Sequence, residues 1–545
     1  MKLTKLFQIF TSILPYFAVF FASLFHPYDN DLGWYLKYGE YFIKNHQILR
    51  ENIFSSQMAD FKWVNHSWGT DLISYLTFDN FGFLGLSILA AVVVTATFYF
   101  FAKASKLDLF EKALIFPALI YFLSPLNSVS FRGQLLSLLF LGILSYILFE
   151  QSHVHGTERD VVENYSSNDQ KTSRFAHIRS LSRRVNGFYL LPFLFALWSN
   201  IHGQFILGLA VFAIWIAATV GADIFDNGFF GKVFQSTRPG LGSGSARLRP
   251  CLKLRNLLVV FIVSAFAVLV NPFGFGVYQE AVKHFGNPLE AYISEWVPFK
   301  MLSIPWWGQV LAGLGIFFGI IFLFFSEKIK EKLPEISIAS VLYLISFSVR
   351  RFVWPMYYFS IPLIAPVANF LKPESKKYAN IAAGTIFVTY IALTFLIDNP
   401  VKRIQNMSWQ SYCAINIHCS DGAINHLNSI LDPNLLDVLD PEGLRPERAK
   451  LLTYYGWGGY IIANYPEIKP SVDGRMTLWR DETGFSAFEE YFAYEQNQND
   501  IDKSPYDVVL MSPQKPLYKR LEKLVSEDKW QKVYEDKFAG VFVKK

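Results

Sequence analysis

Charged side chains are scarce in this sequence. Asp, Glu, Lys and Arg make up only 17% of its 545 residues, whereas soluble globular proteins carry about 25%. Apolar residues reach 52%, the mean hydropathy is +0.25, and long apolar stretches recur between Gln8 and Ile397. This composition excludes an ordinary soluble enzyme and predicts an α-helical polytopic membrane protein.

Cysteine is also rare. Cys251, Cys413 and Cys419 are too few for a disulfide scaffold or a cysteine zinc site. Cys413 and Cys419 either form one bridge, if they face an oxidising compartment, or are two free thiols. The basic start of the chain is not followed by an A-x-A-like cleavage site, so we expect the first apolar segment to remain as a helix.

Eleven segments are candidates for spanning helices, which need about 20 apolar residues each. The pair 188–199 and 204–222 is short, but one helix through the break at His202-Gly203 is less plausible. The candidates lie near 8–25, 82–102, 112–127, 133–149, 188–199, 204–222, 256–271, 309–326, 335–349, 353–371 and 378–397.

The basic residues of the loops predict the orientation of these helices. With a cytoplasmic N-terminus, the loops on one side are rich in Lys and Arg, and those on the other side are much poorer. The positive-inside rule therefore places the segment after the eleventh helix on the outer face. Because Lys and Arg mostly set the orientation of a membrane protein, the net charge of +5 does not indicate a nucleic-acid partner, and we expect none. The basic side includes two polar loops, 151–186 and 226–255.

The composition changes at about residue 403, where charges become frequent. The pattern predicts a buried strand over 506–511, a helix over 517–528 and a terminal hairpin over 530–543. We therefore expect a membrane domain over 1–402, with a first outer loop at 26–81. A small soluble α/β domain is expected over 403–545, on the outer face.

The unusual polar residues fall on the predicted outer side. Asp29 and Asp31 form a D-x-D in the first outer loop. Ionisable groups at membrane depth are costly and point to function. Arginines suit phosphate, whereas a carboxylate can act as a general base and a carboxylate pair can hold a divalent cation. The other candidates are Glu40, Asn65, His66, Arg132, Gln134, Asn200, His202, Glu295, Arg350 and Arg351.

Each of these residues also has a structural interpretation. Asp29 could cap the next helix, and Arg350 and Arg351 could extend from the membrane to the interface. His202 could be a satisfied polar residue in a helix break. The gathering of all of them on one face favours a site for an anionic, lipid-carried substrate.

The run from His26 to Gly82, with D-N-D-L-G-W-Y-L-K-Y-G-E-Y-F-I and W-V-N-H-S-W, resembles a bacterial family of polytopic membrane proteins. These are identified as glycosyltransferases of the C-type (GT-C) fold, related to the lipid A and protein O-mannosyl transferases. F-R-G-Q, W-S-N-I-H-G, N-P-F-G and S-E-W fit further blocks, as do Tyr455–Tyr460 and Val472–Arg475. The resemblance covers most of the chain, and its link to a reaction is one of fold.

The resemblance implies a bacterial inner-membrane enzyme that uses a polyprenyl-phosphate sugar donor. It would transfer a hexose or pentose, with inversion, to a glycan, lipid or protein acceptor on the outer face. Asp31 would be the base, and Asp29 would assist it or share a divalent cation, Mg²⁺ or Mn²⁺, with it. The donor phosphate would be bound by Arg132, Arg350, Arg351 and His202. The substrate would be lined by Glu40, Asn65, His66, Gln134, Asn200 and Glu295.

One departure from the family concerns Arg132-Gly133-Gln134, where R-P-Q is expected. The glycine loosens the backbone and leaves the orientation of Arg132 open. Two rival functions also stay open: a transporter or flippase for a lipid-linked glycan, and a non-catalytic envelope scaffold.

For two patterns of the C-terminal segment we rank the structural interpretation above a functional one. The run Gly456–Gly459 lacks the spacing of a phosphate-binding loop, so Gly458-Gly459 is expected to permit a tight turn into a helix. Asp473 and Arg475 are expected to be a structural pair, with an acceptor-binding edge as the alternative.

Overall fold

The computed structural model gives the fold of most of the chain. The polar loops predicted on the basic side lie largely outside the described residues, as does Ser294 of the S-E-W block. The described residues are 2–127, 131–164, 187–227, 249–284, 287, 291–293, 295–298, 304–326, 328–405, 407–431 and 450–545.

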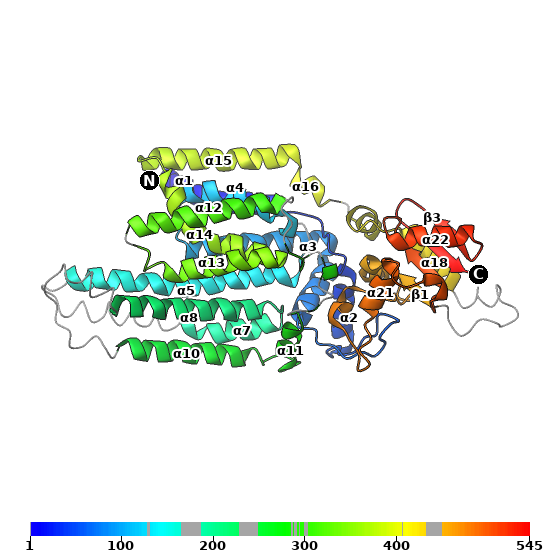
Figure 1. The fold of residues 1–545 in the computed structure, drawn as a ribbon. Helices are drawn as coiled ribbons and strands as arrows, with labels where there is room; N and C mark the ends of the chain where they lie inside the picture. The colour runs from blue at the N-terminus through cyan, green and yellow to red at the C-terminus, as the bar shows by residue number, and fades with distance from the viewer. Residues whose placement is uncertain are drawn as a thin grey trace.

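Long helices lie side by side in one bundle (Figure 1). Each of the eleven predicted apolar segments falls on one of these helices. They are α1 (Lys2–Ala22), α3 (Trp68–Ala104), α4 (Leu109–Asn127), α5 (Gly133–Asn164), α7 (Leu191–Ser199), α8 (Phe205–Asn227), α10 (Arg249–Ala267), α12 (Ile304–Phe325), α13 (Leu333–Ser348), α14 (Val353–Phe370) and α15 (Lys376–Ile397).

Within the described residues, six helices are long and apolar enough to cross a membrane by length and composition. Shorter apolar helices lie at Phe10–Ala22, Gly187–Ser199, Leu254–Ala267 and Leu333–Ser348. The chain is therefore a helical membrane protein, whereas the number of eleven spans stays a prediction. The break predicted at His202-Gly203 is present, because α7 ends at Ser199 and α8 begins at Phe205.

Much of the segment 26–81, predicted as the first outer loop, is helical. It contains α2 (Leu32–Asn45) and the first turns of α3, which begins at Trp68. Gly82 interrupts α3 with φ 59° and ψ −154°, a backbone conformation that suits glycine. Gly82 thus separates the first turns of α3 from the part that continues into the bundle.

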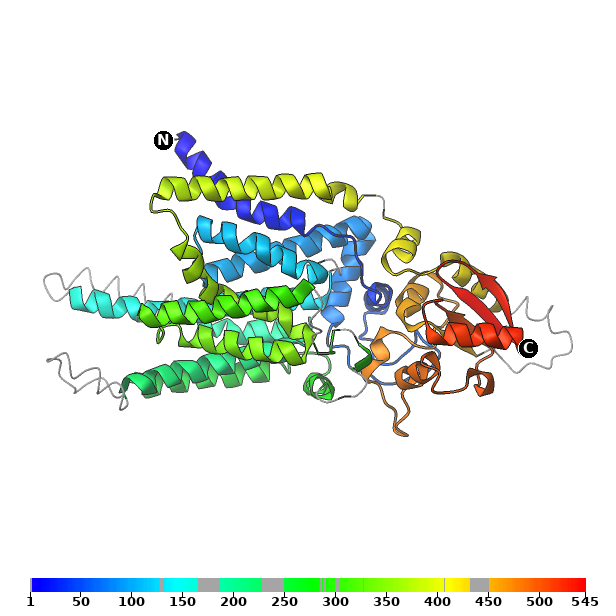
Figure 2. The same cartoon turned by 45° about the horizontal axis from the view of Figure 1, so that its top comes forward.

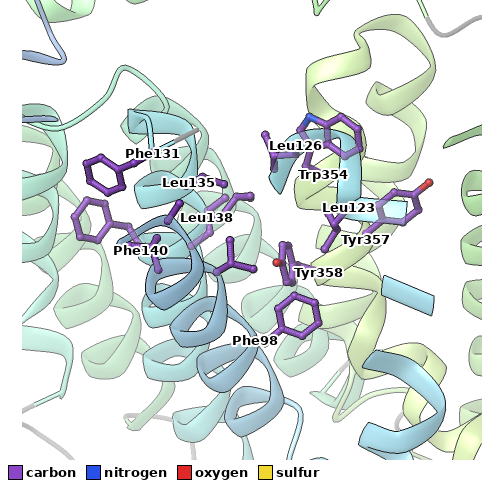
Figure 3. Close-up of a cluster of buried hydrophobic side chains, with 14 of the residues drawn as sticks. Phe98, Leu123, Leu126, Phe131, Leu135, Leu138, Phe140, Trp354, Tyr357 and Tyr358 are labelled. Atoms are coloured by element: carbon purple, nitrogen blue, oxygen red, sulfur yellow. The ribbon is translucent and has the colours of Figure 1, made fainter. Parts of the chain in front are cut away.

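Aromatic and aliphatic side chains fill the space between the bundle helices. Figure 3 shows Phe98 of α3 and Leu123 of α4 close to Tyr358 of α14, and Leu138 of α5 belongs to the same buried cluster. All four are buried. Because lipid tails are as apolar as leucine, van der Waals packing rather than exclusion of water holds such helices together.

The C-terminal segment carries a four-stranded sheet with the order β1-β2-β4-β3. β1 (Leu451–Thr453) pairs with β2 (Val508–Met511) in parallel, and β4 (Gly540–Lys544) pairs antiparallel with both β2 and β3 (Trp530–Glu535). The predicted strand, helix and terminal hairpin are thus all present, with the helix as α22 (Pro516–Ser526).

Short helices connect the bundle to the sheet and surround it. Figure 2 shows that the C-terminal segment lies at one end of the bundle and that the N-terminus lies at the opposite end. The short helices are α11 (Gly276–Lys283), η2 (Arg350–Phe352), α16 (Pro400–Arg403), α17 (Trp409–Ser411), η3 (Tyr412–Asn416), α18 (Asp421–Leu431), η4 (Tyr455–Trp457), α20 (Gly458–Asn464), η5 (Gly474–Leu478), α21 (Ala487–Glu495) and η6 (Ile501–Lys503).

The bundle and the C-terminal segment share part of their core. Leu32 of α2 and Phe83 of α3 belong to the same cluster of buried side chains as Tyr412, Trp457 and Tyr460. The C-terminal segment is therefore packed onto the bundle, and a domain boundary at residues 402 and 403 stays a prediction.

Candidate functional site

Two arginines from distant parts of the chain share one carboxylate. Arg132 precedes α5, Arg351 lies in η2, and Glu295 lies in the segment between α11 and α12. Arg132 Nη1 donates a hydrogen bond to Glu295 Oε1 at 3.1 Å, and Arg351 Nε is 3.9 Å from Glu295 Oε2. The Arg351 peptide N–H also donates to the Glu295 carbonyl at 2.9 Å, so backbone pairing holds Glu295 against η2.

Asp29 joins this group from the first outer loop. Its Oδ2 is 3.6 Å from Arg132 Nε, and its side chain is only 6% exposed. Its Oδ1 accepts the Asp31 N–H at 3.1 Å, in a turn that leads into α2. Asp29 therefore both shapes the start of the helix and faces an arginine. Burial raises the pKa of this carboxyl, and the charge of Arg132 only partly offsets that effect.

Asp31 is the residue immediately before α2 and is half-buried. Burial and the neighbouring charge of Asp29 raise its pKa to about 7, although Arg132 acts in the opposite direction. Two carboxylates at one site oppose each other's ionisation. Asp31 therefore changes its charge near neutral pH, where a general base is effective.

Glu295 behaves differently from the two aspartates. Burial opposes its ionisation, but Arg132 and Arg351 outweigh burial and lower its pKa. Glu295 is thus an ionised carboxylate between two cations. A phosphate oxygen would make the same contacts, because guanidinium groups bind carboxylate and phosphate in the same way.

His202 contacts Arg351 and accepts a hydrogen bond from it. Arg351 Nη2 is 3.1 Å from His202 Nε2, and an arginine can only donate. The other ring nitrogen, Nδ1, lies 2.9 Å from Ser137 Oγ. Trp198 Nε1 donates to the same Ser137 oxygen at 2.9 Å. Burial and Arg351 lower the pKa of His202, so this histidine is neutral at pH 7.

Further aromatic rings surround Arg351. The Trp296 ring centroid is 5.1 Å from the guanidinium carbon, and Trp296 stacks on His284 at 4.6 Å. The His66 ring is 6.0 Å from that of His202. Burial and Arg351 lower the pKa of His66 to about 4, so it too is neutral at pH 7. His66 and His202, both predicted from the sequence, therefore meet beside one arginine.

Two of the predicted residues, Asn65 and Asn200, make contacts that serve the fold. Asn65 Nδ2 donates to Asp71 Oδ2 at 2.7 Å, and Asn200 Oδ1 accepts from Trp68 Nε1 at 2.9 Å. Gln134, two residues after Arg132, is buried. Its Oε1 accepts no hydrogen bond within the described residues.

Glu40 and Arg350 take part in none of the ion pairs described above. Glu40 forms ion pairs with Lys37 at 2.9 Å and Lys44 at 2.5 Å, both on its own helix α2. Arg350 donates its peptide N–H to the Val297 carbonyl at 3.2 Å. Within the described part of the chain, the ion pairs of Glu295 include Arg132 and Arg351 but not Arg350.

Sequence reasoning missed the contribution of the C-terminal segment to this site. A Cβ on Gly33 of α2 would lie 2.5 Å from the Gly459 carbonyl carbon, so the glycines allow α2 and α20 to touch. Gly458 is the first residue of α20, after the turn of η4. The predicted turn into a helix is present, and close helix contact is the further reason for the glycines.

Asp473 and Arg475 form the structural pair that was expected. Both side chains are fully buried, and Arg475 Nη2 is 2.7 Å from Asp473 Oδ2. Tyr455, from the block Tyr455–Tyr460, was also missed. Burial, as the largest cause, and the charges of Asp31, Asp29 and Glu295 raise the pKa of Tyr455. Its place in the run Tyr455–Tyr460 was the sequence signal that could have identified it.

Cys413 and Cys419 form a disulfide, with their Cα atoms 4.9 Å apart. Of the two alternatives that the sequence left open, the structure has the bridge. No group of three or more His, Cys, Asp and Glu side chains that could hold a metal ion occurs among the described residues. Any cation at this site would depend on the pair Asp29 and Asp31, with other ligands from water or substrate.

Comparison with known proteins finds only distant likeness. No family model matches the chain, and no curated protein matches it. Three crystal structures of the Archaeoglobus fulgidus oligosaccharyltransferase are similar to it, each with a TM-score of 0.46 over 92% of this chain. The apo form is 9% identical, with 69% of its chain covered. The form tethered with an acceptor peptide containing the NVT sequon is 10% identical, also with 69% covered. The complex with Zn and sulfate is 10% identical, with 68% covered. This degree of likeness does not by itself establish a fold family.

Proposed function

We propose that this protein is a membrane glycosyltransferase of the GT-C type. It moves a sugar from a polyprenyl-phosphate-linked donor to an acceptor on the outer face. The observation that carries the proposal is the meeting of Asp29 and Asp31 with Arg132, Arg351 and Glu295 at one end of a helical membrane bundle. An acid–base group and an anion-binding group thus lie side by side, as transfer from a sugar phosphate requires.

The reaction is a single displacement at the anomeric carbon. Asp31 takes the proton from the acceptor hydroxyl, whose oxygen forms the new bond to the sugar. The bond between the sugar and the phosphate oxygen breaks, and the phosphate leaves with the electron pair. Arg132 and Arg351 stabilise the charge that develops on the phosphate. One displacement inverts the configuration of the sugar.

A divalent cation fits the carboxylates of this site. Asp29 Oδ2 is buried and accepts no hydrogen bond within the described residues. The charge of each carboxylate also disfavours the ionised form of the other, and a cation would relieve this repulsion. Asp29 and Asp31 would hold Mg²⁺ or Mn²⁺. Both cations prefer oxygen ligands, and substrate phosphates commonly supply some of them. When bound, the cation would neutralise charge on the leaving phosphate.

The disulfide supports the outer location of the site. Bridges between cysteines persist in oxidising compartments and are rare in the cytosol. Cys413 and Cys419 lie in the C-terminal segment, close to the first outer loop, because Tyr28 donates to the carbonyl of Ile415 at 3.3 Å. Both segments then face the oxidising side. In a bacterium this is the outer side of the inner membrane.

The proposal is tested by transfer from a labelled donor. The purified protein in nanodiscs is incubated with undecaprenyl phosphate that carries a ³H-labelled hexose or pentose, in the presence of membrane acceptors. Release of label from the lipid is expected with the wild type and not with Asp31→Asn. Asp60→Asn is the matched control, because Asp60 is an exposed aspartate of the same outer loop. Full activity of Asp31→Asn, or movement of the intact lipid without transfer, would contradict the proposal.

A further inference from the structure

We propose that the turn Asp473-Gly474-Arg475 of the C-terminal segment is a positioning element for the carboxylate of Asp31. The inference rests on the proposed function, in which Asp31 is the base. It assigns to the C-terminal segment a role in the reaction although the segment lies outside the membrane bundle.

The first observation is the approach of Gly474 to Asp31. A Cβ at Gly474 would lie against Asp31 Oδ1, 2.6 Å from its Cγ and 2.8 Å from its Oδ2. Real Cβ atoms essentially never approach a heavy atom this closely. The Asp31 carboxylate therefore packs on the bare backbone of Gly474, and any side chain there would push the carboxylate away.

The second observation is the way in which the turn is held. Asp473 Oδ1 accepts hydrogen bonds from Arg475 N at 3.0 Å and from Arg475 Nε at 2.8 Å. Arg475 Nη2 also donates to Asn52 Oδ1 at 2.9 Å and to Ser55 Oγ at 3.0 Å. Ser55 in turn donates to Asp473 Oδ2. A buried, paired charge with several hydrogen bonds is fixed in position.

The third observation is the origin of these partners. Asn52 and Ser55 belong to the first outer loop, which also carries Asp31. The guanidinium of Arg475 also lies over Phe54 and Trp63 of this loop, at 5.1 Å and 5.5 Å from the ring centroids. The loop thus binds the turn at one point, and the turn contacts the loop again at Asp31. This arrangement fixes where the carboxylate lies relative to Arg132.

The experiment compares Gly474→Ala with Gly384→Ala. Gly384 is the matched control because a Cβ there meets nothing within 4 Å. A water-soluble carbodiimide with an amine nucleophile modifies carboxyl groups that water reaches, and peptide mass spectrometry identifies the modified aspartate. For the wild type and for Gly384→Ala we expect little modification of Asp31 at a fixed pH, because its carboxylate packs on Gly474. For Gly474→Ala we expect modification of Asp31 to rise severalfold, because the new Cβ displaces the carboxylate from this contact.

Transfer activity is measured on the same samples. Gly474→Ala is expected to lower kcat about tenfold or more, with little change in the donor KM, because a displaced base affects the chemical step. If Gly474→Ala is not monodisperse, Ser55→Ala carries the test, and we expect a smaller change in the same direction. Unchanged labelling of Asp31 and an unchanged kcat in the folded variant would overturn the inference. Absence of transfer by the wild type, with increased labelling of Asp31 in Gly474→Ala, would overturn only the proposed function.

Discussion

Arg351 Nη2 donates to Nε2 of His202 at 3.1 Å, and this contact defines the role of both side chains. A protonated imidazole has no acceptor, so His202 can hold Arg351 only in its neutral form. Ser137 and Trp198 complete the chain of hydrogen bonds behind the histidine. His202 therefore orients an arginine that would contact the donor phosphate.

The first prediction concerns this orientation. We expect His202→Leu to raise the donor KM about tenfold with a smaller effect on kcat, because Arg351 loses the acceptor that fixes its geometry. His202→Gln keeps an acceptor oxygen and should retain most of the affinity. The measurement is the donor KM of both variants. Equal losses in the two variants would show that the acceptor is not what matters.

The second prediction concerns the base. Asp31→Asn removes the proton acceptor and should lower kcat by about 10²–10⁴, the usual contribution of general base catalysis. The thermal unfolding midpoint should not fall, because the substitution also removes a buried charge that Asp29 repels. Rates are compared with those of Asp60→Asn. A loss of activity in both variants would point to the loop rather than to the carboxylate.

The third prediction concerns pH. Because the base must be ionised, kcat should rise with pH through a midpoint at about 7 and then level off. Asp29→Asn removes a negative charge that raises the pKa of Asp31, so the midpoint should move to lower pH. The measurement is the pH profile of kcat for both proteins. A midpoint that stays in place would exclude coupling between the two carboxylates.

The fourth prediction concerns Glu295. Its carboxylate lies where an oxyanion would bridge Arg132 and Arg351. Glu295→Gln removes the competing charge, so inorganic phosphate should inhibit transfer more strongly and raise the unfolding temperature more than in the wild type. Glu482→Gln, at an exposed glutamate of the C-terminal segment, is the control. Weaker inhibition by phosphate would mean that Glu295 belongs to the binding site instead.

The fifth prediction concerns stability. Arg475→Met leaves Asp473 as a buried, unpaired carboxylate, which should cost about 3–5 kcal/mol. The double variant with Asp473→Asn should recover part of this loss, because no charge is then left buried. The measurement is denaturant unfolding followed by tryptophan fluorescence, to which Trp63 and Trp479 beside Arg475 contribute. No recovery in the double variant would show that the pair matters for its hydrogen bonds rather than for its charge.

Local patterns predicted much of the fold. Apolar runs of about 20 residues form helices because the backbone must satisfy its own hydrogen bonds in lipid, and this requirement is visible in the sequence. The sequence positions of the eleven apolar helices of the bundle and of the hairpin of β3 and β4 follow from such patterns. The helical content of the first outer loop was underestimated, because α2 is amphipathic and too polar to stand out as a span.

The sequence by itself determined that Asp29 and Asp31 lie two residues apart, and it predicted that polar residues of several loops belong to one side of a membrane protein. Only the tertiary structure decided their partners. Arg351 donates a hydrogen bond to His202, Glu295 bridges two arginines, and Gly474 contacts Asp31. These contacts join residues that are far apart in the chain, and each depends on how helices pack and where backbones approach. Hydrophobic periodicity records which face of a segment is buried, but it does not record which distant segment covers that face.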